Sequence, residues 1–327
     1  MKTLTLLIII LFTPLNYADN NLDFFGVTLE NDFFFNEDGL YSNGLIATWG
    51  YDDIQRLDEQ ALPDWLAYVA QKSYLNAQQD KRYAITYRVA QLMQTAIDDS
   101  VAELVTEDAP YVGMLAWQGQ LSAYDTITID RLSLILGMVG PVTGTKFTQA
   151  VVHHLRGASD TKGWENQLSN EFIFRLQAER LWRIYDKTLG NTEFDTLTGI
   201  NGGFGTLRSD LGVGIGFRWG QDLHSNFSSA SAFPMQKLNR PQNSPDGWYL
   251  FANASALYVA NDIFMDGNTF QDSHSVDIIR HQYGASVGLM ANIYNWNFLF
   301  TVLRLSEQYQ GQNERSRFGS LSVTYYF

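Results

Sequence analysis

The chain has 327 residues, a formal net charge of −13 and no cysteine, and 14% of its residues are aromatic. The acidic balance excludes a typical nucleic-acid-binding protein, because binding to phosphates requires clustered lysine and arginine. The lack of cysteine excludes a fold that is held together by disulfide bonds.

The N-terminal residues 1–18, MKTLTLLIIILFTPLNYA, have the layout of a secretory signal peptide. Lys2 precedes an apolar core from Leu4 to Phe12, and the small Ala18 precedes an acidic segment. The alternative is a membrane anchor, but the apolar run is too short to cross a bilayer as a helix. We therefore expect residues 1–18 to be a signal peptide and residues 19–327 to form a single exported domain.

Runs of alternating apolar and polar residues follow along the whole chain. Phe25, Val27 and Leu29 alternate with smaller or polar residues, and the last run, RFGSLSVTYYF, alternates in the same way up to Phe327. Such alternation gives a strand one apolar and one polar face. The runs cover approximately residues 25–30, 42–53, 82–89, 110–124, 126–139, 165–181, 189–201, 204–219, 247–260, 276–291, 295–309 and 316–327.

These runs predict an all-β fold, a twelve-stranded antiparallel transmembrane β-barrel in the bacterial outer membrane. The runs are long for a globular sheet but suit tilted membrane strands, and bacterial single-chain barrels have an even number of strands. A soluble β-sandwich is the alternative, and a closed barrel is favoured because it leaves no unpaired edge in lipid. A terminal aromatic residue such as Phe327 also resembles the end of strands that the outer-membrane assembly machinery inserts.

An even number of strands places both termini in the periplasm, so the connections after odd-numbered strands face outside. We expect two long periplasmic segments, 54–79 and 220–246. The sequence of segment 54–79 predicts an amphipathic helix that begins near Pro63, with Trp65 and Tyr74 on one face. We expect this helix to cap the barrel mouth. The outer connections are 36–41, 95–109, 140–164, 202–203, 261–275 and 310–315.

The third outer connection contains a predicted helix over residues 145–156. Gln149 and His153 are four residues apart and share a helix face, which Lys146 and Arg156 extend, whereas His154 is rotated by about 100°. The alternative is a solvated surface helix without chemistry.

Three further polar residues fall at the same level. Asn31 continues the parity of Leu29 and is therefore predicted on the lipid side, where an unpaired amide is costly. Asp32 follows it, and Ser42 begins the second strand. Alternatively, Asn31 and Asp32 form only a turn after the strand.

Together these residues suggest ester hydrolysis at a membrane surface. A neutral histidine such as His153 is a competent general base near pH 7. The oxygens of Asp32 and Asn31 suit Ca²⁺, which stabilises an oxyanion. The sequence has no G-x-S-x-G motif of soluble hydrolases.

Six segments resemble, in this order, the signatures of the lipid A 3′-O-deacylase (LpxR) family: ENDFFF, YSNG, EDAPYVGML, LGMVGPVTG, QAVVHHLRGA and GWENQLSNE. The similarity extends from about residue 24 to Phe327 and is densest between residues 130 and 171. It implies a calcium-dependent outer-membrane esterase that removes the 3′-acyloxyacyl group of lipid A, the lipid part of lipopolysaccharide, in the outer leaflet. The family's active site lies between the outer wall of the barrel and a helix from an extracellular loop.

Carried over by position, the resemblance implies roles for several residues of this chain. Asn31 and Asp32 match the family's pair associated with the metal and the oxyanion, Ser42 matches a site hydroxyl, and His153 matches the catalytic base. Gln149, one turn before His153, is our own candidate for an orienting residue.

The sequence departs from the family pattern in the second outer connection. That segment has no lysine where the best-studied type has one at the site, and DAPYVG lacks the arginine of the commoner form. Lys146 or Arg156 is the candidate replacement for the positive charge. Acidic side chains of the segment are further candidates for calcium binding, namely Asp98, Asp99 and Asp108.

Two alternative functions remain open from the sequence. In one, Ser42 is a nucleophile that His153 activates, as in outer-membrane phospholipases. In the other, the chain is a porin or structural barrel and the loop helix has no chemical role.

Overall fold

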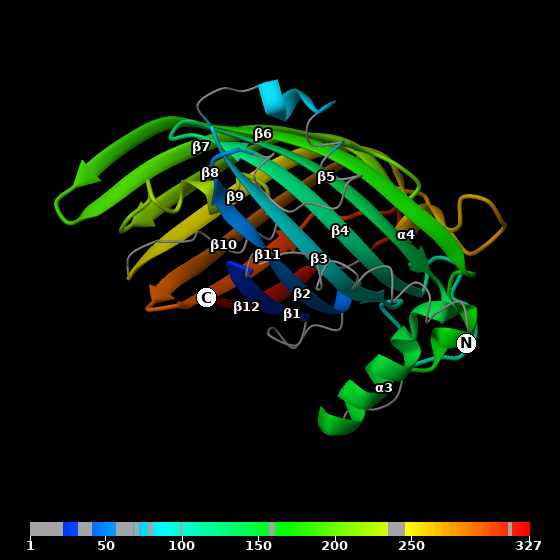
Figure 1. Ribbon diagram of the computed structural model, residues 1–327. Helices are drawn as coiled ribbons and strands as arrows, with labels where there is room; N and C mark the ends of the chain where they lie inside the picture. The colour runs from blue at the N-terminus through cyan, green and yellow to red at the C-terminus, as the bar shows by residue number, and fades with distance from the viewer. Residues whose placement is uncertain are drawn as a thin grey trace.

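The computed structural model describes residues 22–31, 41–56, 68, 72–77, 81–98, 100–156, 161–234, 246–312 and 316–327. The strands form one closed antiparallel barrel, in which each strand pairs with its neighbours in sequence and the first pairs with the last (Figure 1). The strands are β1 (Phe24–Asn31), β2 (Tyr41–Ile54), β3 (Arg82–Gln94), β4 (Val112–Tyr124), β5 (Thr128–Val139), β6 (Glu171–Leu189), β7 (Thr192–Phe204), β8 (Arg208–Gly220), β9 (Gly247–Asp262), β10 (His281–Ile293), β11 (Trp296–Leu305) and β12 (Arg317–Tyr326). The predicted twelve-stranded barrel is confirmed.

The helices lie in the connections between strands. They are η3 (Tyr74–Ala77), η4 (Pro141–Thr143), α3 (Thr145–Arg156), η5 (Gly163–Asn166), η6 (Phe227–Ser229) and α4 (Ile263–Asp266). The predicted helix 145–156 is α3, with the predicted bounds. No helix in the described part of the chain is both long and apolar enough to span a membrane.

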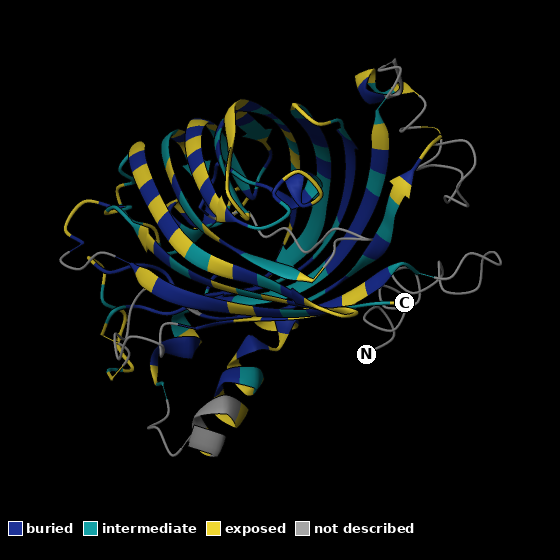
Figure 2. Ribbon diagram, turned by 90° about the vertical axis from the view of Figure 1, so that its left-hand side faces the viewer, coloured by how far each residue is buried: buried dark blue, intermediate teal, exposed yellow. Residues whose placement is uncertain are grey.

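The strands present apolar side chains outward and polar ones to the lumen. On β1, Phe25, Val27 and Leu29 are 43–44% exposed, whereas Thr28 and Glu30 are buried inside. Figure 2 shows the same alternation of exposed and buried bands along the barrel wall. An apolar outer surface around a polar interior is the arrangement of a barrel surrounded by lipid, and the chain is an outer-membrane protein.

The barrel closes between its first and last strands. β1 and β12 pair along the whole of β1, from Phe24 opposite Tyr326 to Asn31 opposite Gly319. Inside the lumen, the hydroxyl groups of Thr28 and Ser322 are 2.6 Å apart. Closure satisfies the backbone hydrogen bonds of both strands, which lipid cannot do.

β6 is displaced from its predicted position. We expected a strand over residues 165–181, but residues 163–166 form η5, and β6 extends from Glu171 to Leu189. The polar sequence near Asp186 and Lys187 is typical of a connection. It instead forms the protruding part of a hairpin with β7, closed by a tight turn in which Gly190 has a φ of 65°. The other strand boundaries shift by a few residues.

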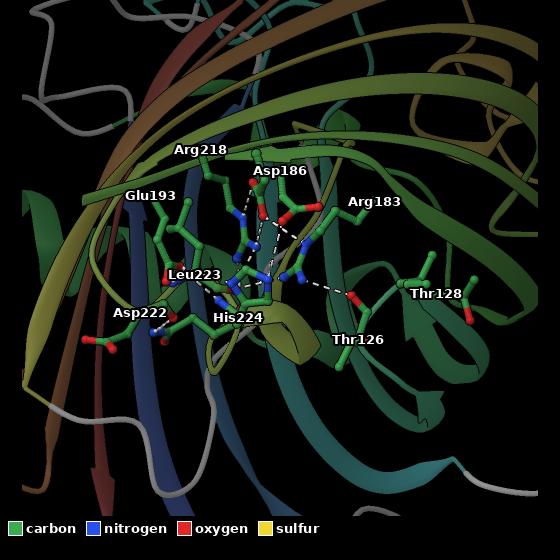
Figure 3. A network of polar contacts seen from close by, with 12 residues as sticks. Thr126, Thr128, Arg183, Asp186, Glu193, Arg218, Asp222, Leu223 and His224 are labelled. Carbon is green, nitrogen blue, oxygen red and sulfur yellow. Dashed lines mark hydrogen bonds and ion pairs between the residues drawn. The ribbon is translucent and has the colours of Figure 1, made fainter. Parts of the chain in front are cut away.

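The periplasmic half of the lumen is filled by the chain itself. We call residues 223–233, which include η6, the lumen plug. The guanidinium group of Arg218 donates to Asp195 at 3.0 Å and to the carbonyl oxygens of Leu223 and Asn226 at 2.9 Å each. Arg183 contributes a second ion pair to Asp195 at 3.2 Å (Figure 3). The strands thus hold the plug through a buried network of charges.

Apolar contacts complete the lumen plug. Phe227, Ala232 and Phe233 are at most 3% exposed and pack against Leu181 and Leu197 of the strands. Residues 220–246 were expected only as a long connection on the periplasmic side. The interior position is possible because the strands supply arginine donors for the backbone carbonyl oxygens of the plug.

α4 lies in the extracellular half of the lumen. The side chain of Gln94 donates to the carbonyl oxygen of Phe264 at 2.9 Å, and Ile263 and Met265 are each 1% exposed. A cavity of about 310 Å³ remains in the lumen, lined by side chains that include Arg88, Gln118, Arg131 and Phe264.

The segment before β3 lies on the outer wall and not in the barrel mouth. Leu75 of η3 is fully buried against Tyr83, Ile85 and Tyr87, which have the outward parity of β3. The hydroxyl group of Tyr83 donates to the carbonyl oxygen of Leu75 at 3.3 Å. The expected cap on the mouth is therefore wrong for η3. Most of the predicted helix lies outside the described residues.

Candidate functional site on the outer wall

A row of four outward-facing residues crosses the extracellular end of the first four strands. Asn31 lies opposite Asn43, Asn43 opposite Met93, and Met93 opposite Gly113. Asn31 and Asn43 are each only 8% exposed. The wall therefore changes at this row from exposed apolar side chains to covered amides.

The outward position of Asn31 agrees with the parity prediction. The preceding outward residue of β1, Leu29, is 44% exposed, and its partner Leu45 on β2 is 49% exposed. A polar pair next to an exposed apolar band is expensive unless it is bonded. The amide pair therefore lies on the lipid side of the wall and not in the lumen.

Ser42 occupies an irregular position in β2. Tyr41 pairs with Gln94 and Asn43 pairs with Met93, so Ser42 is an additional residue without a partner on β3. Such β-bulges redirect side chains and are common next to active sites. The side chain of Ser42 and the whole of Asp32 lie outside the described residues.

α3 begins on the same row. A Cβ atom at Gly113 would lie 1.9 Å from the Oγ1 atom of Thr145 and 2.6 Å from that of Thr143. Gln91 on β3 donates to the carbonyl oxygen of Thr143 at 2.8 Å. Glycine at position 113 thus allows the start of the helix to approach the wall closely.

Two glycines shape the chain before α3. Gly140 and Gly144 have φ angles of 98° and 70°, which favour glycine. The amide of Gly140 donates to the carbonyl oxygen of Gly113 at 2.9 Å, which ties the turn to β4. The GPVTG sequence therefore turns the chain from the end of β5 onto the outer wall.

Gln149 is held by η5. Its side-chain oxygen accepts a hydrogen bond from the indole NH of Trp164, and both side chains are buried, at 5% and 3% exposure. Trp164 packs against Met93, Ala96 and Tyr111. Gln149 thus fastens α3 to the loop, and an orienting action on His153 stays a prediction.

Lys146 forms an exposed ion pair with Glu165 in the same connection. The ammonium group of Lys146 lowers the pKa of the Glu165 carboxyl below its usual value by donating a hydrogen bond to it. Lys146 remains 58% exposed, so it can still meet an anionic group from outside. The side chain of Arg156, the other candidate for the positive charge, lies outside the described residues.

His153 lies on α3, four residues after Gln149, so the two share a helix face as predicted. Its side chain is outside the described residues, and the neighbouring His154 is exposed. From Thr145 to His153 the helix advances about 12 Å. Three strand spacings, from Gly113 to Asn31, amount to about 14 Å. The helix thus falls slightly short of Asn31, and it extends away from the wall in Figures 1 and 2, so a contact between His153 and Asn31 stays a prediction.

Asp108 has a structural role. Its carboxylate accepts from the amides of Ile97, Asp98 and Ala109 at 2.7–3.1 Å and from the hydroxyl group of Tyr309 at 2.8 Å. Burial and the Asp108 carboxylate raise the pKa of Tyr309. Asp108 thus joins the second outer loop to the last one, and these contacts argue against its use as a calcium ligand.

The other acidic candidates in that loop give little support for calcium binding. Asp98 accepts from the hydroxyl group of Ser100 at 2.6 Å, which lowers its pKa. Asp99 lies outside the described residues. Within the described part of the chain, no three His, Asp or Glu side chains are close enough together to hold a metal ion.

The amide pair is chemically suited to calcium. Calcium takes oxygen ligands, including the side-chain oxygens of asparagine. Asn31 and Asn43 supply two such groups on adjacent strands at the same height. Asp32, which directly follows Asn31, is the residue expected to add the negative charge.

Three residues of this region were not predicted from the sequence. Asn43 has the same parity as the outward Leu45 and Trp49, so parity alone could have placed it beside Asn31. The contacts of Gly113 and Trp164 with α3 have no signal in a single sequence, because they depend on how the loop folds back onto the wall.

Comparisons with known proteins agree with this arrangement. The family model "Outer membrane protein LpxR" matches residues 4–327. The solved structure of LpxR from Salmonella typhimurium is 15% identical, with a TM-score of 0.77, and the match covers 93% of this chain and all of that chain. At 15% identity, the structural match shows the fold alone. A search of curated proteins finds no match.

Two other solved barrels match less well. The KdgM porin is 7% identical with a TM-score of 0.38, and the match covers 93% of this chain and 99% of that one. The translocator domain of the autotransporter NalP from Neisseria meningitidis is 11% identical with a TM-score of 0.44, covering all of this chain and 96% of that one. Neither similarity is close enough to support an argument.

Proposed function

The chain belongs to the LpxR family of outer-membrane proteins, and from this premise we propose that it is a calcium-dependent lipid A 3′-O-deacylase. This carboxylic ester hydrolase releases the 3′-acyloxyacyl group of lipid A in the outer leaflet. Family membership supports the coarser assignment, an outer-membrane lipid A deacylase. The metal, the base and the ester that is cleaved are our proposal.

The observation that carries the proposal is the amide pair on the outside of the barrel. Asn31 and Asn43 face outward at the height where the exposed apolar band ends. A polar site facing the lumen would serve a solute that crosses the barrel. A polar site on the outer wall instead serves a molecule that lies in the membrane.

In the proposed reaction, His153 acts as the general base. Its imidazole takes a proton from a water molecule, and the water oxygen attacks the ester carbonyl carbon. The amide of Asn31 donates a hydrogen bond to the carbonyl oxygen, where negative charge develops. The bond to the sugar oxygen then breaks, and the imidazolium of His153 returns its proton to that oxygen. The products are an acyloxy fatty acid and a free 3′-hydroxyl group.

Calcium would be held by Asp32 and Asn31, with Asn43 in reach of the same position. When bound, the ion supplies a positive charge that polarises the ester and stabilises the oxyanion. Asp32 and Asn31 would contribute the oxygen ligands.

A second enzymatic reading uses Ser42 as the nucleophile. The bulge at Ser42 supports it, because bulges redirect side chains next to active sites. The Ser42→Ala variant separates the two mechanisms. Water attack predicts that most activity remains, whereas a serine nucleophile predicts complete loss.

Mass spectrometry of lipid A from cells with and without the gene tests the function directly. Loss of a 3′-acyloxyacyl group that depends on the gene is the expected result. A change in phospholipids instead would indicate a phospholipase. No change in either lipid class, in cells whose barrel is folded and exposed, would contradict an acyl hydrolase and favour a structural barrel.

A further inference from the structure

α3 exposes an apolar face that nothing in the described structure covers. Phe147 is 75% exposed, and Val151, one turn later on the same face, is 43% exposed. Val142 of η4, just before the helix, is 42% exposed. An exposed apolar face of this kind marks a contact surface.

The opposite side of α3 is covered by the extracellular loops. Gln149, about 200° around the helix from Phe147, is bonded to Trp164. Trp164 packs against Ala96 and Tyr111, which lie beyond the ends of β3 and β4. With the loops on its extracellular side, α3 turns Phe147 and Val151 toward the membrane.

The apolar face is continuous with the lipid-facing wall of the barrel. The first residue of α3, Thr145, lies against Gly113. Gly113 belongs to the row that contains Asn31 and Asn43. Leu29 and Leu45, the next outward residues below this row, are 44% and 49% exposed. They lie about 7 Å closer to the middle of the membrane. α3 thus begins at the extracellular edge of the apolar band, and it extends outside the ring of strands (Figure 2).

We propose that α3 is an interfacial helix whose Phe147 and Val151 side chains lie among the acyl chains of the outer leaflet. Its polar side, with Lys146 paired to Glu165, faces the headgroup region. The membrane contact follows from the outer-membrane location alone. Its purpose rests on the proposed function: the contact sets the height of His153 at the ester bonds of the lipid.

Single-cysteine labelling tests the position of the helix without any assay of activity. The chain has no cysteine, so Phe147→Cys carries one environment-sensitive fluorophore. Val213→Cys on β8, 57% exposed on the lipid side, serves as the lipid reference. Leu104→Cys, 46% exposed in the second outer loop, serves as the water reference. The variants are reconstituted in vesicles of phosphatidylethanolamine and phosphatidylglycerol whose acyl chains carry a spin label.

The label at position 147 is expected to behave like the label at 213, with strong quenching by the spin-labelled acyl chains and little quenching by iodide. Behaviour like that of the label at 104 would overturn the proposal. Protection from both quenchers, with cross-linking between two chains, would show that a second copy covers the face and would also overturn it.

The purpose of the contact is tested with Phe147→Ser and Phe147→Leu. Phe147→Ser is expected to lower deacylation in vesicles by about tenfold, and Phe147→Leu to restore most of it, because leucine keeps the apolar contact. If both variants are equally active while the label at 147 lies in lipid, the helix contacts the membrane but the contact has no role in catalysis. Absence of deacylation in the unmodified protein would contradict the proposed function and not the position of the helix.

Discussion

At the scale of single residues, His153 carries the proposed chemistry, and His154 beside it is the internal control. The two are rotated by about 100° on α3, so only one of them can meet Asn31. We expect His153→Ala to lower deacylation of lipid A in vesicles by about 10²- to 10⁴-fold and His154→Ala to have little effect. Heat-dependent migration in gels verifies that both barrels are folded. Equal losses would mean that the helix face is assigned wrongly.

Calcium binding is a second property of individual residues. Removing divalent ions with EGTA is expected to abolish deacylation, and added Ca²⁺ to restore it. Asn31→Ala is expected to shift the calcium dependence to higher concentrations, because it removes an oxygen ligand. The measurement is the initial rate against free calcium. Activity that is indifferent to chelation would exclude the metal.

Replacing Asp222, next to the lumen plug, is expected to change the stability of the protein in a pH-dependent way. Burial and the nearby charge of Glu193 raise the pKa of the Asp222 carboxyl. A carboxyl with a raised pKa in the folded state favours folding below its unfolded pKa of about 4, and this contribution is lost as the pH rises through the folded pKa. Asp222→Asn is therefore expected to raise the unfolding temperature slightly at pH 7 and to have no effect near pH 4.

The backbone at position 222 makes this variant a clean comparison. Asp222 has a φ of 53°, a conformation that asparagine also accepts. Thermal unfolding in detergent at both pH values checks the prediction. Destabilisation at pH 7 would show that the charge of Asp222 has a favourable partner.

Side-chain parity allowed the outward position of Asn31 to be predicted, because the regular pairing of β1 with β2 continues to its last residue. The bulge at Ser42 was not predictable, since it depends on the register between β2 and β3. The bond from Trp164 to Gln149 was not predictable either, because it joins two parts of a long connection that only the folded loop brings together.

At the scale of elements, the seat of α3 on the barrel wall depends on Gly113. A Cβ atom there would lie 1.9 Å from Thr145 Oγ1, so Gly113→Ala must displace the start of the helix. We expect the barrel to fold but deacylation to fall by up to about 100-fold, because a shift of about 1 Å misplaces a catalytic group. Lipid A deacylation in vesicles is the measurement.

Gly202→Ala on β7 is the matched control, since its nearest atom would be in ordinary contact at 3.4 Å. It is expected to fold and to keep most of its activity. Equal activity of the Gly113 and Gly202 variants would contradict a need for close approach between α3 and β4.

Element boundaries followed the sequence where local signals were strong. The Gly and Pro residues before α3 and the spacing along it predicted a helix over residues 145–156, as observed. The boundaries of β6 were wrong because Arg183 and Asp186 look like loop residues. The first of them is buried against Asp195 of β7, a contact between strands that periodicity does not encode.

At the scale of the whole molecule, the lumen plug should make the barrel a poor channel. Arg218 is 2% exposed and bonds both Asp195 and the plug backbone. Breaking a buried ion pair costs about 3–5 kcal/mol, so Arg218→Ala is expected to loosen the plug. In planar bilayers, the unmodified protein should show background conductance and Arg218→Ala a measurable ion current.

Arg82→Ala is the control for this experiment. Arg82 pairs with Asp53 at 3.5 Å, and both side chains are nearly half exposed, so the pair contributes little. Its conductance should match that of the unmodified protein. Large open channels in the unmodified protein would contradict the closed lumen and favour a porin.

The barrel as a whole could be predicted because alternation recurs in every strand and an even number of strands closes without edges. The filling of the lumen could not be predicted from the sequence. Residues 223–233 are polar and mixed in sequence. Inside the barrel, Arg131, Arg183 and Arg218 on three separate strands donate to their carbonyl oxygens, which the sequence does not show.

The outward direction of Asn31 has a kinetic consequence. On the proposed function, substrate and enzyme meet by lateral diffusion within one leaflet, and the fatty acid departs into the same layer. Turnover should therefore scale with the surface density of the lipid in the bilayer and not with its bulk concentration. Diluting the substrate with inert lipid at constant total amount would slow the reaction, whereas diluting the whole vesicle suspension would not.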